Sequence, residues 1–357
     1  MNILILTTHL NPGGLSRYVL NLSTALRREN HKVWVACSGG EWIGRLTENG
    51  VNYKHIPIRT KSICSLKILF SSLSLRRLIQ QENFDVVHCN TRVTQFLGFL
   101  IYKYFNIPYI GGYHGFYRPS IFRKRFKLSG VLSIAVSRAV REHLIKDLDI
   151  DEKKIKVVYN GIDSNEFLSK EASRGDYGFS DEDYLIGILG RVSQEKGHFL
   201  AVDAIDKLCH RRKNVCLLVS GKGKLEGKLR AYLRQEKLEE KVRFINCRPN
   251  QFLDIIDLLV VPSQKEGFGY SILEAFVKGV PVIGYNTGGI AEIIRNRENG
   301  LLFYNYNSFA LSETVEDIIS NDSLRRKVVQ QAREDVLHFS SRRMAMNTER
   351  VYREAYL

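Results

Sequence analysis

The sequence predicts an α/β protein made of two doubly wound domains, each built around a parallel sheet. Short β-branched runs alternate with amphipathic helical stretches along the chain, which is the pattern of parallel strands covered by helices. This alternation breaks in the polar, glycine-containing segment 163–178 and then starts again. The chain has 357 residues, of which 44% are hydrophobic, so it is too long for one ordinary core and too apolar for disorder.

The first half contains seven runs that we expect to form strands. They are Asn2–Thr7, Lys32–Cys37, Tyr53–Ile58, Asp85–Cys89, Tyr109–Gly111, Ser133–Val136 and Ile155–Val158. Helical stretches between them include Ser16–Glu29, Leu66–Gln80 and Arg138–Lys146.

The second half repeats this arrangement without a close sequence repeat. Its expected strands are Tyr184–Leu189, Val215–Ser220, Val242–Asn246, Leu258–Val261 and Val280–Gly284, and its helices include Phe199–Cys209, Lys224–Leu238, Tyr270–Lys278 and Ala291–Ile294. The tail from Ser308 to Leu357 is expected to be helical, with breaks near Asn321–Asp322 and Ser340–Ser341. We place the first domain at 1–165 together with the terminal helix 341–357, which packs back on it, and the second domain at 166–340.

The cysteines and the amino terminus both favour the cytoplasm. The six cysteines occur singly, within or beside apolar runs, without the paired spacing of metal or redox motifs; they are Cys37, Cys64, Cys89, Cys209, Cys216 and Cys247. No basic segment precedes the first apolar run, so we expect no signal peptide. The longest apolar stretch, 95–110, is shorter than the ~20 residues of a spanning helix and contains Lys103 and Pro108.

The net charge of +15 is concentrated in the first half of the chain. Residues 1–165 contain 24 Lys and Arg against 11 Asp and Glu, and residues 166–357 contain 29 against 27. An excess of +13 in one half and +2 in the other indicates that the first domain contacts something anionic.

The most specific motif joins two glutamates across a glycine-containing loop. Glu266-Gly-Phe-Gly-Tyr-Ser-Ile-Leu-Glu274 follows the apolar strand Leu258–Val261 and opens a helix. Ligands of doubly wound folds bind at the carboxyl ends of the strands, and the free N–H groups of a new helix bind anions. Gly267 and Gly269 would let the backbone approach such a ligand.

This segment resembles the Glu-x7-Glu signature of the family 4 retaining glycosyltransferases. The resemblance implies the GT-B fold, in which two Rossmann-like domains face each other across a cleft. It also implies that Glu266 contacts hydroxyls of the transferred sugar and that Glu274 binds the ribose of a nucleotide-sugar donor. The loop residues Gly267 and Phe268 and the amides of Gly269, Tyr270 and Ser271 would surround the diphosphate.

A second motif supplies positive charge. Gly190-Arg191-Val-Ser-Gln-Glu-Lys196-Gly197 follows the strand Tyr184–Leu189, and two cations with two glycines suit a pyrophosphate. It is similar to the Gly-Arg-x(n)-Lys-Gly element of the same family, which implies that Arg191 and Lys196 hold the donor phosphates. Fixed cations of this kind can stabilise a diphosphate leaving group.

Further candidates lie in the first domain. Gly13 and Gly14 follow the first strand, with Ser16 as the expected N-cap of the next helix. They match the glycine loop that approaches the donor from this domain in the family, and His114, between glycines, matches a histidine that faces the transferred sugar. His88 and Asn90 end the strand Asp85–Cys89 and could either line the acceptor side or be structural.

Two further elements match the family outside the charged motifs. Asn160-Gly-Ile-Asp163 resembles the Asn-Gly-x-Asp at the hinge between the domains, with a role in turn geometry. Gly288-Gly289-Ile290-Ala-Glu292 and Asn299-Gly300 also match, and the first of these could lie near the donor sugar. The resemblance spans nearly the whole chain and is weakest at 59–138.

The resemblance favours front-face attack by an acceptor hydroxyl, with positioning and electrostatics supplied by the protein. The motifs contain no Asp-x-Asp clamp, so we expect no metal and no cofactor beyond the nucleotide-sugar substrate. Three alternatives stay open: a sugar-nucleotide epimerase of the same architecture, a phosphorylase that uses inorganic phosphate, and a basic nucleic-acid-binding protein. The Glu-x7-Glu context argues against the first. No cofactor lysine or second phosphate site stands out for the second, and the third lacks a nucleic-acid motif.

Basic and aromatic residues around 116–127 suggest a membrane-facing surface in the first domain. Cations at Arg118, Arg123, Lys124, Arg125 and Lys127 alternate with Phe116, Tyr117, Ile121, Phe122 and Phe126. Lys61, Lys67, Arg76 and Arg77 surround the helix at 66–78 in the same way. The alternative is a solvated helix face. We therefore expect a lipid-linked or cell-envelope glycan as acceptor, and no nucleic acid, for a cytoplasmic protein able to lie on the inner face of the membrane.

Overall fold

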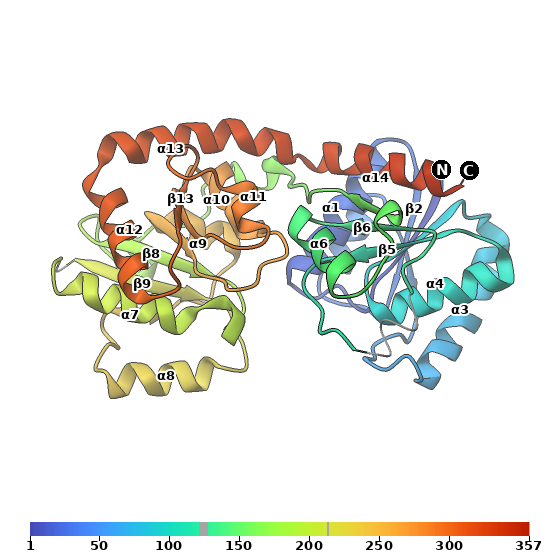
Figure 1. Cartoon of the computed structure of the whole chain (residues 1–357), viewed down its shortest axis with the longest axis horizontal. Helices are drawn as coiled ribbons and strands as arrows, with labels where there is room; N and C mark the ends of the chain where they lie inside the picture. The colour runs from blue at the N-terminus through green and yellow to red at the C-terminus, as the bar shows by residue number, and fades with distance from the viewer. Residues whose placement is uncertain (121–127, 213, 357) are drawn as a thin grey trace. The chain divides into compact units, whose positions relative to one another are not determined.

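The computed structural model describes residues 1–120, 128–212 and 214–356 (Figure 1). The chain forms two compact units. Unit 1 comprises Met1–Gly161 and Phe339–Leu357, and unit 2 comprises Ile162–His338. The boundaries expected from the sequence, after 165 and after 340, differ from these by a few residues.

Unit 1 contains a parallel sheet with the strand order β3-β2-β1-β4-β5-β6-β7. The strands are β1 (Asn2–Leu6), β2 (Lys32–Cys37), β3 (Asn52–His55), β4 (Val86–Cys89), β5 (Tyr109–Tyr113), β6 (Leu132–Ala135) and β7 (Ile155–Val157). The central strands β1 and β4 are buried on both faces, which explains their nearly continuous apolar sequence.

Helices cover both faces of this sheet. They include α1 (Gly14–Arg28), α2 (Ile43–Glu48), α3 (Leu66–Glu82), α4 (Arg92–Phe105), α6 (Arg138–Lys146) and α14 (Ser341–Tyr356). The last helix of the chain, α14, packs against α1 and buries Met344 and Tyr352 (Figure 1). An apolar face on α14 therefore completes the core of unit 1 from the far end of the sequence.

The start of α1 differs from the expectation that Ser16 caps it. The helix begins at Gly14 with Gly13 as its N-cap, and Ser16 is buried in the first turn. The Gly13 carbonyl accepts the first helical bond from Arg17 N–H at 2.9 Å. Glycine is an acceptable N-cap, so the helix starts three residues earlier than an N-cap at Ser16 would place it.

Unit 2 contains a second parallel sheet, with the order β10-β9-β8-β11-β12-β13. Its strands are β8 (Tyr184–Leu189), β9 (Val215–Ser220), β10 (Val242–Phe244), β11 (Leu258–Val261), β12 (Val282–Tyr285) and β13 (Leu301–Phe303). Its helices include α7 (His198–Cys209), α8 (Glu226–Gln235), α9 (Pro249–Ile255), α10 (Tyr270–Lys278), α11 (Ile290–Ile293), α12 (Ser308–Ser320) and α13 (Asp322–Asp335). The breaks expected near Asn321–Asp322 and Ser340–Ser341 are present in the helical tail.

Some elements were not among those named from the sequence. They are the helices α2, α4 and α9 and the strand β13, and α4 occupies part of the apolar stretch 95–110. Within residues 1–120, 128–212 and 214–356, no helix combines the length and the apolarity that a membrane span requires.

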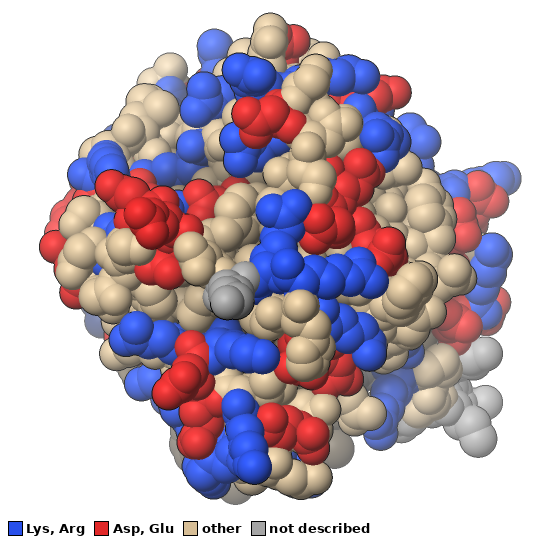
Figure 2. Space-filling view, turned by 90° about the vertical axis from the view of Figure 1, so that its left-hand side faces the viewer, with Lys and Arg blue, Asp and Glu red and all other residues tan. Residues whose placement is uncertain are grey.

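The surface charge of unit 2 is mixed. Basic and acidic side chains lie side by side on the face shown in Figure 2. Ion pairs of unit 2 include Arg212–Glu316 and Arg230–Glu226. This agrees with the small net charge of the second half of the chain, and it leaves the excess of basic residues in unit 1.

Candidate functional site

The predicted site residues lie in loops that follow the carboxyl ends of strands. These strands are next to the point in each sheet where the strand order reverses. In unit 1 the strand order reverses between β1 and β4, and in unit 2 between β8 and β11. Gly13 and Gly14 follow β1, Arg191 and Lys196 follow β8, and the Glu266 loop follows β11. Doubly wound proteins bind ligands at this topological switch point, because the loops of the two central strands leave in opposite directions there.

The loop that carries Glu266 is braced by a neighbouring loop. Gly289 N–H donates to the Glu266 carbonyl at 2.9 Å, and Thr287 Oγ1 donates to the Gln264 carbonyl at 3.2 Å. A Cβ on Gly289 would lie 2.5 Å from the Cα of Phe268, so only glycine allows this approach. The segment Gly288–Gly289 thus shapes the loop that positions Glu266.

The Glu266 carboxylate forms an ion pair with Lys196. Their Oε2 and Nζ atoms lie 2.5 Å apart, and the side chains are 16% and 27% exposed. Arg191 is exposed on the same loop as Lys196, with Glu195 between them. The structure therefore brings Arg191, Lys196 and Glu266 together at the ends of the adjacent strands β8 and β11.

Glycines on two of these loops have no packing role. A Cβ on Gly13, Gly14 or Gly190 would meet no atom within 4 Å. Gly197 differs, because its Cβ would lie 2.1 Å from the Pro262 carbonyl oxygen. The open space at the first three leaves room for a ligand close to the backbone, although the Gly190 N–H itself donates to the Ser220 carbonyl at 2.9 Å.

The helix α10 begins at the predicted phosphate loop. Gly269 is its N-cap, with φ +113°, which favours glycine, and Tyr270 and Ser271 form the first turn. Phe268 is buried beneath the loop, and its ring lies 6.2 Å from that of Tyr270. Glu274 follows one turn later and is 5% exposed. The helix thus begins beside Glu266, with Glu274 on its second turn.

His114 lies in a polar cluster within unit 1. Its Nε2 is 2.9 Å from Asn90 Oδ1, and its ring lies 4.4 Å from the ring of Tyr18, edge to face. Burial lowers the pKa of His114 to about 3, so its imidazole is neutral near pH 7. His88 belongs to the same cluster, and burial together with His114 lowers its pKa to about 3 as well.

Two members of this cluster had no sequence signal. Tyr18 lies in the middle of α1, and Tyr352 lies in α14, where its hydroxyl is 2.6 Å from His88 Nδ1. Both tyrosines are fully buried and fit apolar helix patterns, so nothing distinguished them from ordinary core residues.

The Asn160–Asp163 segment ends the first passage of the chain through unit 1. Asn21 Nδ2 donates to the Gly161 carbonyl at 2.8 Å, and the Gly161 N–H approaches the Met344 sulfur at 3.1 Å. A Cβ on Gly161 would lie 2.4 Å from the Ser340 carbonyl oxygen. Glycine therefore allows this segment to pack against the start of α14.

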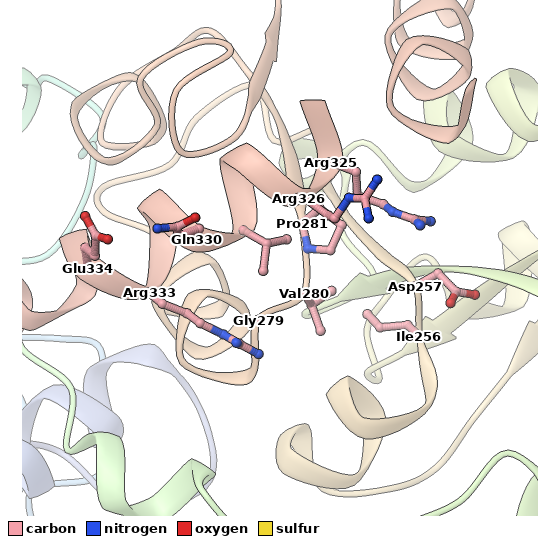
Figure 3. A pocket seen from close by; sticks show the side chains of 11 residues that line it. Ile256, Asp257, Gly279, Val280, Pro281, Arg325, Arg326, Gln330, Arg333 and Glu334 are labelled. Carbon is pink, nitrogen blue, oxygen red and sulfur yellow. The ribbon is translucent and has the colours of Figure 1, made fainter. Parts of the chain in front are cut away.

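A pocket of about 780 Å³ in unit 2 lies away from these residues (Figure 3). It is lined by Ile256 and Asp257, which precede β11, by Gly279–Pro281, which precede β12, and by residues of α13. In Figure 3 the side chain of Arg333 extends toward Gly279. The pocket thus lies at the amino-terminal edge of the sheet, opposite the edge that carries Glu266.

Among the described residues, no group of His, Cys, Asp and Glu side chains has the arrangement of a metal site.

Comparison with known families matches most of the chain. Residues 12–166 match Glycosyltransferase Family 4, and residues 169–335 match Glycosyl transferases group 1. An uncharacterised glycosyltransferase of Methanocaldococcus jannaschii is 28% identical to this chain, over 96% of the chain and 95% of that protein.

One further relative and one solved structure are similar over most of their length. The Escherichia coli UDP-Gal:alpha-D-GlcNAc-diphosphoundecaprenol alpha-1,3-galactosyltransferase is 25% identical, over 88% of this chain and 89% of that protein. The crystal structure of Anabaena Alr3699/HepE in complex with UDP and glucose superimposes with a TM-score of 0.82 at 21% identity, over 98% of both chains. The fold of two Rossmann-like domains is therefore that of the GT-B proteins.

Proposed function

Because this chain is a glycosyltransferase of family 4, we propose that it moves a sugar from a nucleoside diphosphate donor to an acceptor hydroxyl with retention of the anomeric configuration. The observation that carries the proposal is the cluster of Arg191, Lys196 and Glu266 at the switch point of unit 2, beside the start of α10. Cations and helix amides suit the diphosphate, and a carboxylate suits sugar hydroxyls.

The ion pair with Lys196 argues for the role of Glu266 in binding. A carboxylate neutralised by a lysine at 2.5 Å is a weaker nucleophile than a free one. We therefore propose attack of the acceptor hydroxyl from the face that the leaving group occupies. The new bond joins the acceptor oxygen to the anomeric carbon, the bond from that carbon to the phosphate oxygen breaks, and the hydroxyl proton passes to the departing phosphate.

The relatives support one choice of donor and acceptor. The Anabaena protein binds UDP and glucose, and the Escherichia coli enzyme uses UDP-Gal and a diphosphoundecaprenol-linked sugar. These names support a uridine diphosphate donor and a lipid-linked glycan acceptor for this chain. Sugar-nucleotide epimerisation, the alternative within the same architecture, predicts turnover of donor without any acceptor, whereas transfer requires one.

Arg191→Ala and Lys196→Ala should each weaken binding of free UDP. Both cations are assigned to the phosphates, and a charge-assisted contact is worth about 1.5–3 kcal/mol, or about 10-fold to 100-fold in the dissociation constant. Calorimetry in the presence of excess EDTA measures this effect and tests the proposed independence from metal at the same time. Lys228→Ala, an exposed lysine on α8, is the matched control and should leave the affinity unchanged.

Two outcomes would count against these assignments. Unchanged UDP affinity in a protein that combines Arg191→Ala with Lys196→Ala would remove both residues from the donor site. Binding or transfer that is lost in EDTA and restored by magnesium or manganese would show that a metal carries part of the phosphate charge.

We also propose that unit 1 docks on a membrane that contains acidic lipid, through the exposed face of α3. Four large apolar side chains on this face, Leu66, Leu69, Phe70 and Leu73, are 54–71% exposed. Their helical spacing places them on one side of α3, and the buried residues of the helix lie on the other. The exposed residues therefore form a second apolar face. Single exposed apolar residues are common on soluble proteins, but a contiguous helical stripe indicates an interaction surface.

The residues around this stripe support a membrane as the partner. Lys67, Arg76 and Arg77 on α3 are exposed, and so is Lys61 just before it. Apolar side chains between cations fit the boundary between acyl chains and acidic headgroups. A lipid-linked acceptor would be presented at the same surface.

The basic segment expected to share this role falls largely at residues 121–127, outside the described residues. Phe116 and Tyr117, which precede it, pack within unit 1 against His143. The Phe116 ring lies 5.4 Å from that of His143, and Tyr117 N–H donates to His143 Nε2 at 2.8 Å. These two aromatic residues are therefore partly used in packing, and α3 carries the proposal.

Replacing Arg76 and Arg77 with Gln should reduce sedimentation with vesicles that contain acidic lipid. Each cation near such a surface contributes about 1 kcal/mol, so the double variant should bind about 30-fold more weakly. Salt should release the parent protein, because the attraction is screened. A control variant that replaces Lys228 and Lys237 of unit 2 with Gln removes the same charge and should bind as the parent does.

A second variant tests the apolar side chains of this surface. Leu69→Ser with Phe70→Ser should also weaken vesicle binding, while turnover of a short soluble acceptor stays close to that of the parent. Equal sedimentation of both variants and the parent would show that α3 does not contact the membrane.

A further inference from the structure

The polar cluster around His114 is built on a glycine. A Cβ at Gly112 in β5 would lie 2.8 Å from His88 Nε2, 3.0 Å from Asn90 Oδ1 and 3.1 Å from His114 Nε2. Three polar side-chain atoms from the ends of β4 and β5 therefore converge on one point. Any side chain at 112 would separate them, so the glycine is required by the close approach of these groups.

The amide of Asn90 has one orientation in this cluster. Its Nδ2 donates to the Leu6 carbonyl at 3.2 Å, in the neighbouring strand β1. A carbonyl oxygen only accepts hydrogen bonds, so the amide nitrogen must face Leu6 and the amide oxygen must face the histidine. The backbone N–H of Asn90 also donates to Leu6, at 3.0 Å, which fixes the residue further.

This orientation determines which nitrogen of His114 carries the proton. Asn90 Oδ1 lies 2.9 Å from His114 Nε2, and an amide oxygen cannot donate. The hydrogen of the neutral ring must therefore be on Nε2, which leaves Nδ1 as a lone pair. Among the described residues, no group forms a hydrogen bond with Nδ1, and the side chain is only half-buried.

We propose that Asn90 is a positioning residue that holds His114 in the Nε2–H tautomer, so that His114 accepts a hydrogen bond from a sugar hydroxyl through Nδ1. This role of Asn90 follows from the three contacts among Leu6, Asn90 and His114. The part that concerns the sugar rests on the proposed function, whereas the tautomer does not.

The neutral state of the ring supports this role. Burial lowers the pKa of His114 to about 3, so the imidazole has no second proton to donate near neutral pH. With Nε2–H bonded to Asn90, the lone pair on Nδ1 is the remaining polar group of the ring. A hydroxyl of the transferred sugar is the donor that the proposed reaction brings to this domain.

Nitrogen-15 NMR of histidine-labelled protein reads the tautomer directly. We expect the His114 signal, assigned from its loss in His114→Gln, to show a protonated Nε2 and an unprotonated Nδ1 at neutral pH. A ring protonated on Nδ1, or on both nitrogens, would overturn the proposal. This measurement uses the wild-type chain and no substrate, so it does not depend on whether the chain transfers sugar.

Variants of Asn90 test whether the asparagine is the cause. Asn90→Leu should give a mixture of tautomers and lower kcat about 10-fold to 100-fold, by analogy with the loss seen when the partner that orients a metal-bound histidine is removed. Asn90→Asp keeps the acceptor and should keep the Nε2–H signature. Tyr352→Phe removes the neighbouring bond to His88 and should leave the His114 signature unchanged. An unaltered signature and turnover in Asn90→Leu would show that Asn90 does not position His114.

Discussion

Glu266→Ala should abolish measurable sugar transfer while the protein stays folded. The residue lies in a loop, so its removal creates no cavity in the core, but it removes the only charged contact proposed for the transferred sugar. Loss of one fixed polar contact to a transition state typically lowers kcat about 10²–10³-fold. The loss here should be at least of that size, because the variant also removes the carboxylate that pairs with Lys196, the residue assigned to the donor phosphates.

Because of the ion pair, the effect of substituting Glu266 on kcat/KM should depend on whether Lys196 is present. The two groups are in contact, and contacting residues have coupling energies of about 0.5–3 kcal/mol in double-mutant cycles. We expect Glu266→Gln and Lys196→Met to be less than additive in kcat/KM, because either single change already leaves an unpaired partner. Thermal unfolding of each variant provides the control for folding.

Two results would contradict this interpretation. Near wild-type turnover in a folded Glu266→Ala variant would remove Glu266 from the reaction. Strictly additive effects of the two substitutions would show that the ion pair plays no part once the donor is bound.

Asp254→Asn should destabilise unit 2 by about 3–5 kcal/mol, the cost of breaking a buried ion pair. Asp254 and Lys278 are 5% and 7% exposed, and their Oδ1 and Nζ atoms lie 2.6 Å apart. The neutral amide would leave the ammonium of Lys278 buried without its counter-charge. Lys278 Nζ also donates to the Ser169 carbonyl, and Asp254 Oδ2 accepts from Glu171 N–H, so the pair ties the first residues of unit 2 to α9 and α10.

The thermal midpoint of unit 2 should fall by about 6–20 °C in this variant, given about 2–4 °C for each kcal/mol in a domain of this size. Glu226→Gln in α8 is the control. It breaks an exposed i,i+4 pair with Arg230 and should cost less than about 0.5 kcal/mol. Equal midpoints for Asp254→Asn and the control would show that the buried pair contributes no more than a surface pair.

The strand positions and the doubly wound fold class followed from local patterns. Near-continuous apolar runs such as β8 and β11 indicated buried parallel strands, and alternation with helices indicated doubly wound sheets. Once those sheets are assumed, loops after the central strands must meet at the carboxyl edge, so Arg191, Lys196 and Glu266 could be assigned to one site. The starts of α1 and α4 could not be located in the same way, because N-cap preferences differ by only about a kcal/mol.

The sequence by itself determined the fold class and the segments that form the site, because both depend on periodicity and on glycines next to strand ends. The tertiary structure decided which side chains touch. Lys196 and Glu266 are 70 residues apart, Asn90 and His114 are 24 apart, and His88 and Tyr352 are 264 apart. Each pair meets because neighbouring strands, or the terminal helix that returns to unit 1, place the two residues at the same level along adjacent elements. This register depends on how whole elements pack against one another, and the pattern of residues within a single element does not encode it.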